Sequence, residues 1–109
     1  MKNDTAYLKH ILEAIDKIES YLSHATFESF PKNNMMVDAV VRELEIIGEA
    51  TGNLSDELQN QYPDVPWDKI KGIRNVLIHE YFQVDLKIVW ESCKKNLPEL
   101  KRFVAEILG

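Results

Sequence analysis

The fold of this chain is decided around one stretch, Ile70-Lys71-Gly72-Ile73-Arg74-Asn75-Val76-Leu77-Ile78-His79-Glu80-Tyr81. Its apolar residues recur three and four positions apart, at Ile70, Ile73 and Leu77, which is the spacing of one buried face of an α-helix. The stretch therefore predicts a helix that is mostly committed to a core.

Three side chains of the same stretch can carry chemistry: the permanent cation Arg74, His79, which ionises near neutral pH, and the phenol Tyr81. On an ideal helix two positions five apart are rotated by roughly 140°. Arg74 and His79 diverge if the helix stays regular through His79. They converge on one ligand if the helix ends or loosens there, or if a second copy of the helix faces the first. A structural role is also open, in which Arg74 pairs with a carboxylate and His79 caps the last turn.

Two amphipathic helices are predicted before this stretch, from about Asp4 to Ser23 and from about Asn33 to Thr51. Gly52 and Asn53 end the second one. The apolar stripes consist of Leu8, Ile11, Leu12, Ile15, Ile18 and Leu22 in the first helix, and of Val37, Val40, Val41, Leu44, Ile47 and Gly48 in the second.

Proline sets the limits of the remaining segments. Pro31 disfavours helix at Phe30, so we expect Phe27 and Phe30 to pack a connecting loop onto the core. A short helical turn begins at Ser55 and is closed by Pro63, and Pro66 then starts the helix of the opening stretch. A final helix from about Val84 to Leu108 must be kinked or divided by Pro98.

The expected architecture is all-α, an up-and-down bundle of four main helices plus a short extra helix, in a single domain spanning residues 1–109. A single cysteine, Cys93, excludes a disulfide framework and a multi-cysteine metal site, and His10 and His24 lack partners at metal-ligand spacing. We expect no metal, no cofactor, no membrane span and a cytoplasmic location. The net charge of −5 argues against a general nucleic-acid surface and against DNA as partner, so RNA binding would be local or assisted.

Arg-x4-His-x-Tyr, with Asn75 directly after the arginine, resembles the signature of HepT-like proteins. These are a branch of the HEPN superfamily of small helical ribonucleases, toxins found beside MNT-type nucleotidyltransferase antitoxins. The segments Val40–Ala50, Pro66–Ile70 and Val84–Trp90 resemble the same family, so the likeness covers nearly the whole chain.

The resemblance implies a metal-independent endoribonuclease with Arg74 and His79 as catalytic residues and RNA as substrate. Such cleavage needs a base that takes the proton of the 2′-hydroxyl, a positive group that stabilises the charge developing on the phosphate, and an acid that protonates the leaving oxygen. One Arg–His pair supplies too few groups for these three roles, whereas the two pairs of a homodimer supply enough. Asn75 would orient these groups or cap the helix. Tyr81 would be the tyrosine that an MNT antitoxin modifies with AMP, unless it simply closes the bundle.

Arg42, Glu45 and Glu49 can share one helix face, as a possible second shell in which an acidic side chain would position Arg74 or a basic group of a partner. The alternative is an ordinary surface ion pair. Two further hypotheses stay open. The chain could be a non-catalytic nucleotide- or RNA-binding module, or the helical partner subunit of a nucleotidyltransferase. It could also be a purely structural dimerisation domain, for which substitution of Arg74 or His79 would have no effect.

Overall fold

The computed structural model describes residues 3–79 and 85–109, with the backbone alone described for residues 74–79. All regular structure in these ranges is helical, which confirms the all-α prediction. In chain order the elements are α1 (Asp4–Leu22), the 3₁₀ turn η1 (Phe30–Lys32), α2 (Asn34–Gly52), α3 (Asp56–Gln61), α4 (Trp67–His79), α5 (Leu86–Glu91), the π-helical turn η3 (Ser92–Asn96) and α6 (Leu97–Leu108).

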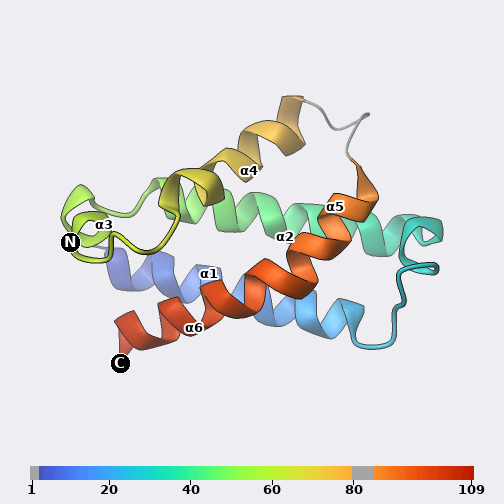
Figure 1. Ribbon diagram of the computed structural model, residues 1–109, viewed down its shortest axis with the longest axis horizontal. Helices are drawn as coiled ribbons and strands as arrows, with labels where there is room; N and C mark the ends of the chain where they lie inside the picture. The colour runs from blue at the N-terminus through green and yellow to red at the C-terminus, as the bar shows by residue number, and fades with distance from the viewer. Residues whose placement is uncertain (1–2, 80–84) are drawn as a thin grey trace.

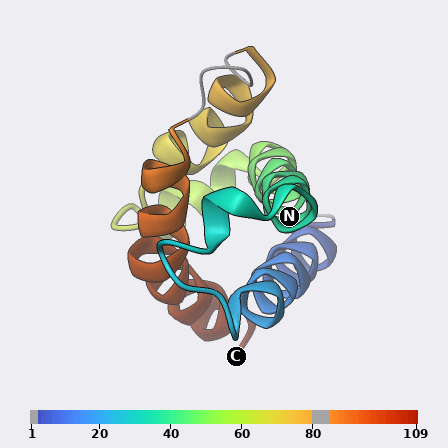
Figure 2. The same ribbon diagram turned by 90° about the vertical axis from the view of Figure 1, so that its right-hand side faces the viewer.

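Helices α1 and α2 form an antiparallel pair along the long axis of the molecule, with α4 lying on α2 and α6 lying on α1 (Figure 1). Seen along that axis, the long helices surround a common centre (Figure 2). The short helix α3 sits in the connection between α2 and α4. This is the expected bundle of four main helices and a short extra one, with α5, η3 and α6 together as the fourth.

The core is apolar and draws on all four main helices. Phe30 is fully buried, and its ring lies 5.5 Å from the ring of Trp90, centroid to centroid. Phe27 departs from the prediction, because its side chain is 45% exposed and only the Lys87 ammonium lies over its ring, at 6.0 Å. The largest fully buried side chains in the described ranges are Leu8, Ile11, Ile15, Ile18, Phe30, Val40, Ile47, Thr51 and Val104.

Helix starts follow the capping residues of the sequence. The Asn33 side chain accepts a hydrogen bond from the Met36 N–H and so begins α2, and Ser55 begins α3 by accepting from the Leu58 N–H. Asp85 caps α5 in the same way, through the Lys87 N–H. The predicted boundaries of α1 and α2 are confirmed to within one residue.

The C-terminal helix is divided, as Pro98 requires. Pro98 has no N–H to donate to the carbonyl one turn earlier, and the backbone widens into the π-helical turn η3 just before it. Helix α6 then restarts at Leu97, with Pro98 in its first turn, where an N–H has no helical partner in any case. Within the described ranges, no helix combines the length and apolar character that crossing a membrane requires.

Candidate functional site

Helix α4 carries the predicted catalytic residues. Its backbone is helical from Trp67 through His79, so Arg74 and His79 occupy one continuous helix. Their backbone positions are therefore rotated by roughly 140° about its axis. The backbone does not loosen between Arg74 and His79, and His79 is the last residue of α4. The side chains of Arg74, Asn75 and His79, and the whole of Tyr81, lie outside the described part of the chain.

The predicted second shell on α2 is loosely connected. The Arg42 guanidinium and the Glu45 carboxylate are 3.9 Å apart, and their side chains are 68% and 29% exposed. At this exposure the pair contributes little to stability. Glu49 lies at the edge of a separate hollow between α1 and α2, which it lines together with Tyr7 and His10. The three residues therefore share a helix face without forming one tight cluster.

One buried carboxylate escaped the sequence analysis. Glu43 is only 7% exposed on α2, and no described residue forms an ion pair or hydrogen bond with it. The helical spacing indicates this burial, because Glu43 lies three residues after Val40 and four before Ile47, both on the predicted buried face. Its burial shows that the apolar stripe of α2 is wider than the residues chosen for it.

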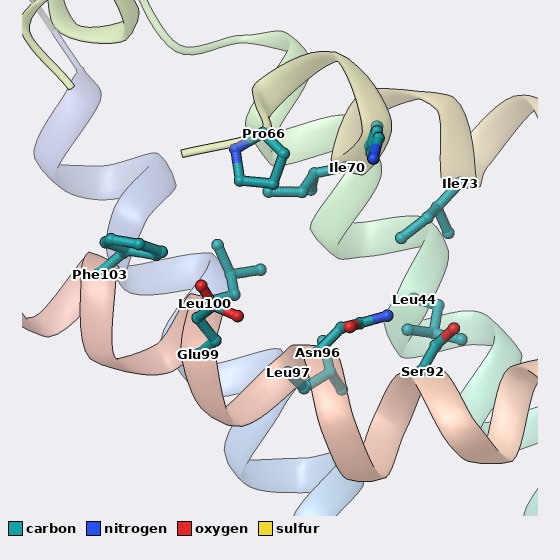
Figure 3. Close-up of a pocket in the computed structure, with 11 residues that line it drawn as sticks. Leu44, Pro66, Ile70, Ile73, Ser92, Asn96, Leu97, Glu99, Leu100 and Phe103 are labelled. Atoms are coloured by element: carbon teal, nitrogen blue, oxygen red, sulfur yellow. The ribbon is translucent and has the colours of Figure 1, made fainter. Parts of the chain in front are cut away.

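A hollow of about 330 Å³ lies between α4 and the C-terminal helix. We call it the α4–α6 hollow. Pro66, Ile70 and Ile73 reach into it from the α4 side, and Leu97 and Leu100 face them from α6 (Figure 3). The remaining lining residues are Leu44, Lys69, Ser92, Asn96, Glu99 and Phe103. An apolar floor with a few polar groups at the rim is a usual composition for a binding site.

The described lysines of α4 differ in whether their ammonium groups already have partners. Lys71 is engaged, since its ammonium lies 3.3 Å from the Asp68 carboxylate and 3.1 Å from the Gln59 side-chain oxygen. Lys69 is exposed and lines the hollow without such a partner among the described residues. Of the two lysines of α4, both in the described part of the chain, Lys69 is thus the one whose ammonium remains available to an outside group.

Neither cysteine chemistry nor a metal centre is supported by the described side chains. Burial raises the pKa of the Cys93 thiol to about 12, so at neutral pH it is a protonated core residue. No group of three or more His, Cys, Asp or Glu side chains in these ranges is arranged to hold a metal ion. His10 is a surface residue whose ring meets the Tyr7 ring edge-on at 6.1 Å.

A bundle of four main helices with an Arg-x4-His pair on its third long helix defines a HEPN-like helical protein. The chain belongs to the ribonuclease HepT-like family, whose sequence model matches residues 11–107. This membership confirms the resemblance drawn from the motif and the expected class of enzyme, a ribonuclease that acts on RNA.

Relatives match along almost the whole chain. A "Putative RNase" of Caldanaerobacter subterraneus subsp. tengcongensis is 44% identical over 108 residues, covering 99% of this chain and 96% of the relative. A "Probable ribonuclease HepT" of Thermococcus cleftensis is 40% identical over 95 residues, 87% of this chain and 86% of the relative. No solved structure matches the chain.

Proposed function

We propose that this protein is the toxin of a type II toxin–antitoxin system, a metal-independent endoribonuclease acting in the cytoplasm as a homodimer. The observation that carries the proposal is the placement of Arg74 and His79 on one unbroken helix of a ribonuclease-family bundle. Because their backbone positions diverge, one copy directs the two groups to different sides of α4. A site that needs both is then completed by the α4 helix of a second copy.

The chemistry follows from these two residue types. One imidazole of the dimer takes the proton of an RNA 2′-hydroxyl, and the 2′-oxygen attacks the adjacent phosphorus. The bond from phosphorus to the 5′-oxygen breaks, and the other imidazole protonates that oxygen. The Arg74 guanidinium binds the phosphate oxygens as negative charge develops, and Asn75 orients the phosphate or the histidine. The products are a 2′,3′-cyclic phosphate and a 5′-hydroxyl, and no metal or cofactor takes part.

Tyr81 is the regulatory residue of the proposal. The partner is an MNT-type nucleotidyltransferase, in whose reaction the Tyr81 oxygen attacks the α-phosphate of ATP and pyrophosphate leaves. The attached AMP brings bulk and a negative charge to the entrance of the site and so repels RNA. On α2, Glu45 is the candidate of the Arg42–Glu45–Glu49 group for positioning Arg74, since its side chain is the better buried partner of the Arg42–Glu45 ion pair.

The test compares purified wild type, Arg74→Ala, His79→Ala and Tyr81→Phe chains on total RNA in excess chelator. We expect the first two substitutions to lower the cleavage rate at least about 10²-fold, the usual loss when acid–base or phosphate-binding groups are removed. Tyr81→Phe should cleave like the wild type but resist modification by the antitoxin with ATP. His24→Ala, which removes a surface histidine from the loop after α1, is the matched control and should keep full activity.

Cyclic-phosphate ends on the products would support the 2′-hydroxyl route. A wild type that is inert without AMP on Tyr81, with Arg74→Ala and His79→Ala still binding RNA equally well, would overturn the catalytic proposal. The non-catalytic binding module would then take its place.

A further inference from the structure

Two lysines of the C-terminal helix lie over aromatic rings. The Lys94 ammonium is 4.9 Å from the centroid of the Trp90 ring, and the Lys87 ammonium is 6.0 Å from that of the Phe27 ring. Both lysines are exposed, and neither forms an ion pair with a residue in the described ranges. A ring beneath an ammonium restrains it but leaves its positive charge uncompensated. The two cations are therefore positioned and still available to bind an anion.

These residues form one line along α5 and η3. Lys87, Trp90 and Lys94 are spaced three and four residues apart, which places them on the same side of the helix. Phe27 adds a second ring at the Lys87 end, from the turn before η1. We call these four residues the lysine–aromatic stripe. At 1.5 Å per residue its two lysines are roughly 10 Å apart along the helix axis, so they suit two phosphates of one strand better than a single phosphate.

The Phe27 ring is presented by a turn that hydrogen bonds hold in place. The Thr26 N–H donates to the Ser29 hydroxyl oxygen at 2.8 Å, and the Ser29 N–H donates to the Thr26 hydroxyl oxygen at 3.0 Å. The Phe30 N–H donates to the Thr26 carbonyl at 2.9 Å, and the Phe30 ring is buried against Trp90. The 45% exposed ring of Phe27 is thus fixed before any ligand arrives, so a flat group that stacks on it loses little free energy to ordering the protein.

The charge along the stripe is opposite in sign to that of the whole chain. Residues 87–95 contain three lysines and one carboxylate, Glu91, whereas the net charge of the chain is −5. The carboxylates next to the stripe in sequence are Asp85, which caps α5, and Glu28, which is exposed beside Phe27. A small group of cations on an acidic protein attracts a polyanion to that place alone. This is the local binding that the net charge requires of an RNA-binding surface.

We propose that the lysine–aromatic stripe binds the RNA strand a few nucleotides away from the bond that is cut. Lys87 and Lys94 contact phosphates of that strand, and one base stacks on the exposed ring of Phe27. These contacts tolerate any sequence, because every base has a π-face and every nucleotide has a phosphate.

The position of the stripe along the chain suits a subsite of the proposed ribonuclease, on whose activity this inference rests. His79 is the last residue of α4, and Lys87 follows it by eight residues, a length of chain that spans at most about 29 Å. Helix α4 ends and α5 begins on the same side of α2, in the same half of the molecule (Figure 1). A strand bound at the motif therefore needs only a few further nucleotides to reach the stripe.

The binding test uses a fluorescein-labelled single strand of 2′-O-methyl RNA, which the proposed 2′-hydroxyl reaction cannot cleave. Fluorescence anisotropy gives the Kd of wild type, Lys87→Ala, Lys94→Ala and the double variant at several salt concentrations. We expect each single substitution to weaken binding about threefold to tenfold at low salt, and the double variant to weaken it by about the product. The slope of log Kd against log salt concentration should fall by about 0.7 for each lysine, because one phosphate contact of a single strand is lost.

Matched variants separate the stripe from a general effect of charge. Lys87→Arg and Lys94→Arg keep a cation that can lie over the ring, so binding should stay within about twofold of wild type. Lys9→Ala removes an exposed cation from the first half of α1, whose start lies at the opposite end of the molecule from α5 (Figure 1), and should leave the Kd and the slope unchanged. Phe27→Leu should weaken binding about fivefold or more without changing the slope, whereas Phe27→Trp should bind at least as tightly as wild type. The inference is overturned if the lysine-to-alanine variants or Phe27→Leu behave like Lys9→Ala.

Cleavage of unmodified RNA in excess chelator distinguishes this inference from the proposed function. The stripe variants should raise KM about as much as they raise Kd and leave kcat within about twofold, as expected when binding energy common to substrate and transition state is lost. A protein that cleaves RNA with a KM and a Kd indifferent to the stripe variants would keep its ribonuclease site and overturn the stripe. A protein that binds the 2′-O-methyl strand through the stripe yet never cleaves RNA would support the stripe and overturn the catalytic proposal.

Discussion

Replacing Asp4 with alanine is expected to destabilise the fold by about 2–3 kcal/mol, because this carboxylate ties the start of α1 to the start of α3 with two charge-assisted hydrogen bonds. One carboxylate oxygen accepts from the Ser55 N–H at 2.8 Å, and the other accepts from the Ser55 hydroxyl at 2.6 Å. Asp4 is 5% exposed, so water can do little to replace the lost bonds. For a chain of this size the loss corresponds to a decrease in Tm of roughly 10 °C.

The cap of α3 is coupled to this contact. The Ser55 hydroxyl donates to Asp4 while its oxygen accepts from the Leu58 N–H at 3.1 Å, so Asp4 fixes the orientation in which the cap works. Combining Asp4→Ala with Ser55→Ala should therefore cost clearly less than the sum of the single effects, with a coupling energy of about 1 kcal/mol or more.

The contribution of Asp4 to the free energy of unfolding depends on pH. Burial raises the pKa of Asp4, whereas the hydrogen bonds from Ser55 and the positive charge of the N-terminus lower it, and the net pKa lies below the ordinary value of 3.8. Because the folded-state pKa lies below the unfolded one, the stabilisation is fully present above the unfolded pKa. It is lost as the pH falls through the folded pKa. The difference in unfolding free energy between wild type and Asp4→Asn should therefore be constant near neutral pH and shrink below about pH 4.

Urea unfolding followed by circular dichroism, repeated from neutral to acid pH, measures these quantities. Asp64→Asn alters an exposed carboxyl in the turn before Val65 and serves as the control, with an expected change within about 0.5 kcal/mol. The reasoning would be refuted if Asp4→Asn were as stable as wild type at pH 7, or if its deficit did not shrink in acid.

Three further outcomes follow from the burial and charge of single side chains. Phe30→Ala should cost about 3–5 kcal/mol in urea unfolding because the ring is fully buried, whereas Phe27→Ala, at a 45% exposed position, should cost less than about 1 kcal/mol. Cys93 should react with a thiol reagent at pH 8 only as fast as the protein unfolds, since burial raises its pKa to about 12. The hydrogen bond to Glu19 raises the pKa of Lys101, which joins α6 to α1, so Lys101→Met should lower Tm slightly at neutral pH. That difference should vanish in about 1 M salt and as the pH rises through the folded pKa of Lys101.

The helices themselves were predictable because local spacing and caps determine them. The apolar stripe of α1 and the Gly52–Asn53 stop of α2 are visible in the residues alone, and so is the division before Pro98. The form of that division was not predictable, since the π-helical turn depends on which backbone carbonyls find partners along the whole helix. Sequence spacing also could not show that Phe30 enters the core while Phe27 does not.

The motif residues of the site could be predicted from the sequence, but the hollow beside them could not. Arg74 and His79 are recognisable at five-residue spacing, whereas the α4–α6 hollow is lined by residues that lie far apart in the sequence. Ser92, Asn96 and Glu99 carry no local pattern that marks them as its rim. Lys69 differs from Lys71 because the Lys71 ammonium is already engaged by Asp68 and Gln59, which sequence spacing does not show.

The proposed cleavage reaction depends on how α4 is held. In the described ranges the main packing partner of α4 is α2. Catalysis by groups held at the wrong angle is slow, because acid–base and phosphate contacts act only within about hydrogen-bond distance. The second copy of the proposed homodimer would therefore do two things at once, completing the set of catalytic groups and fixing the helix that presents them.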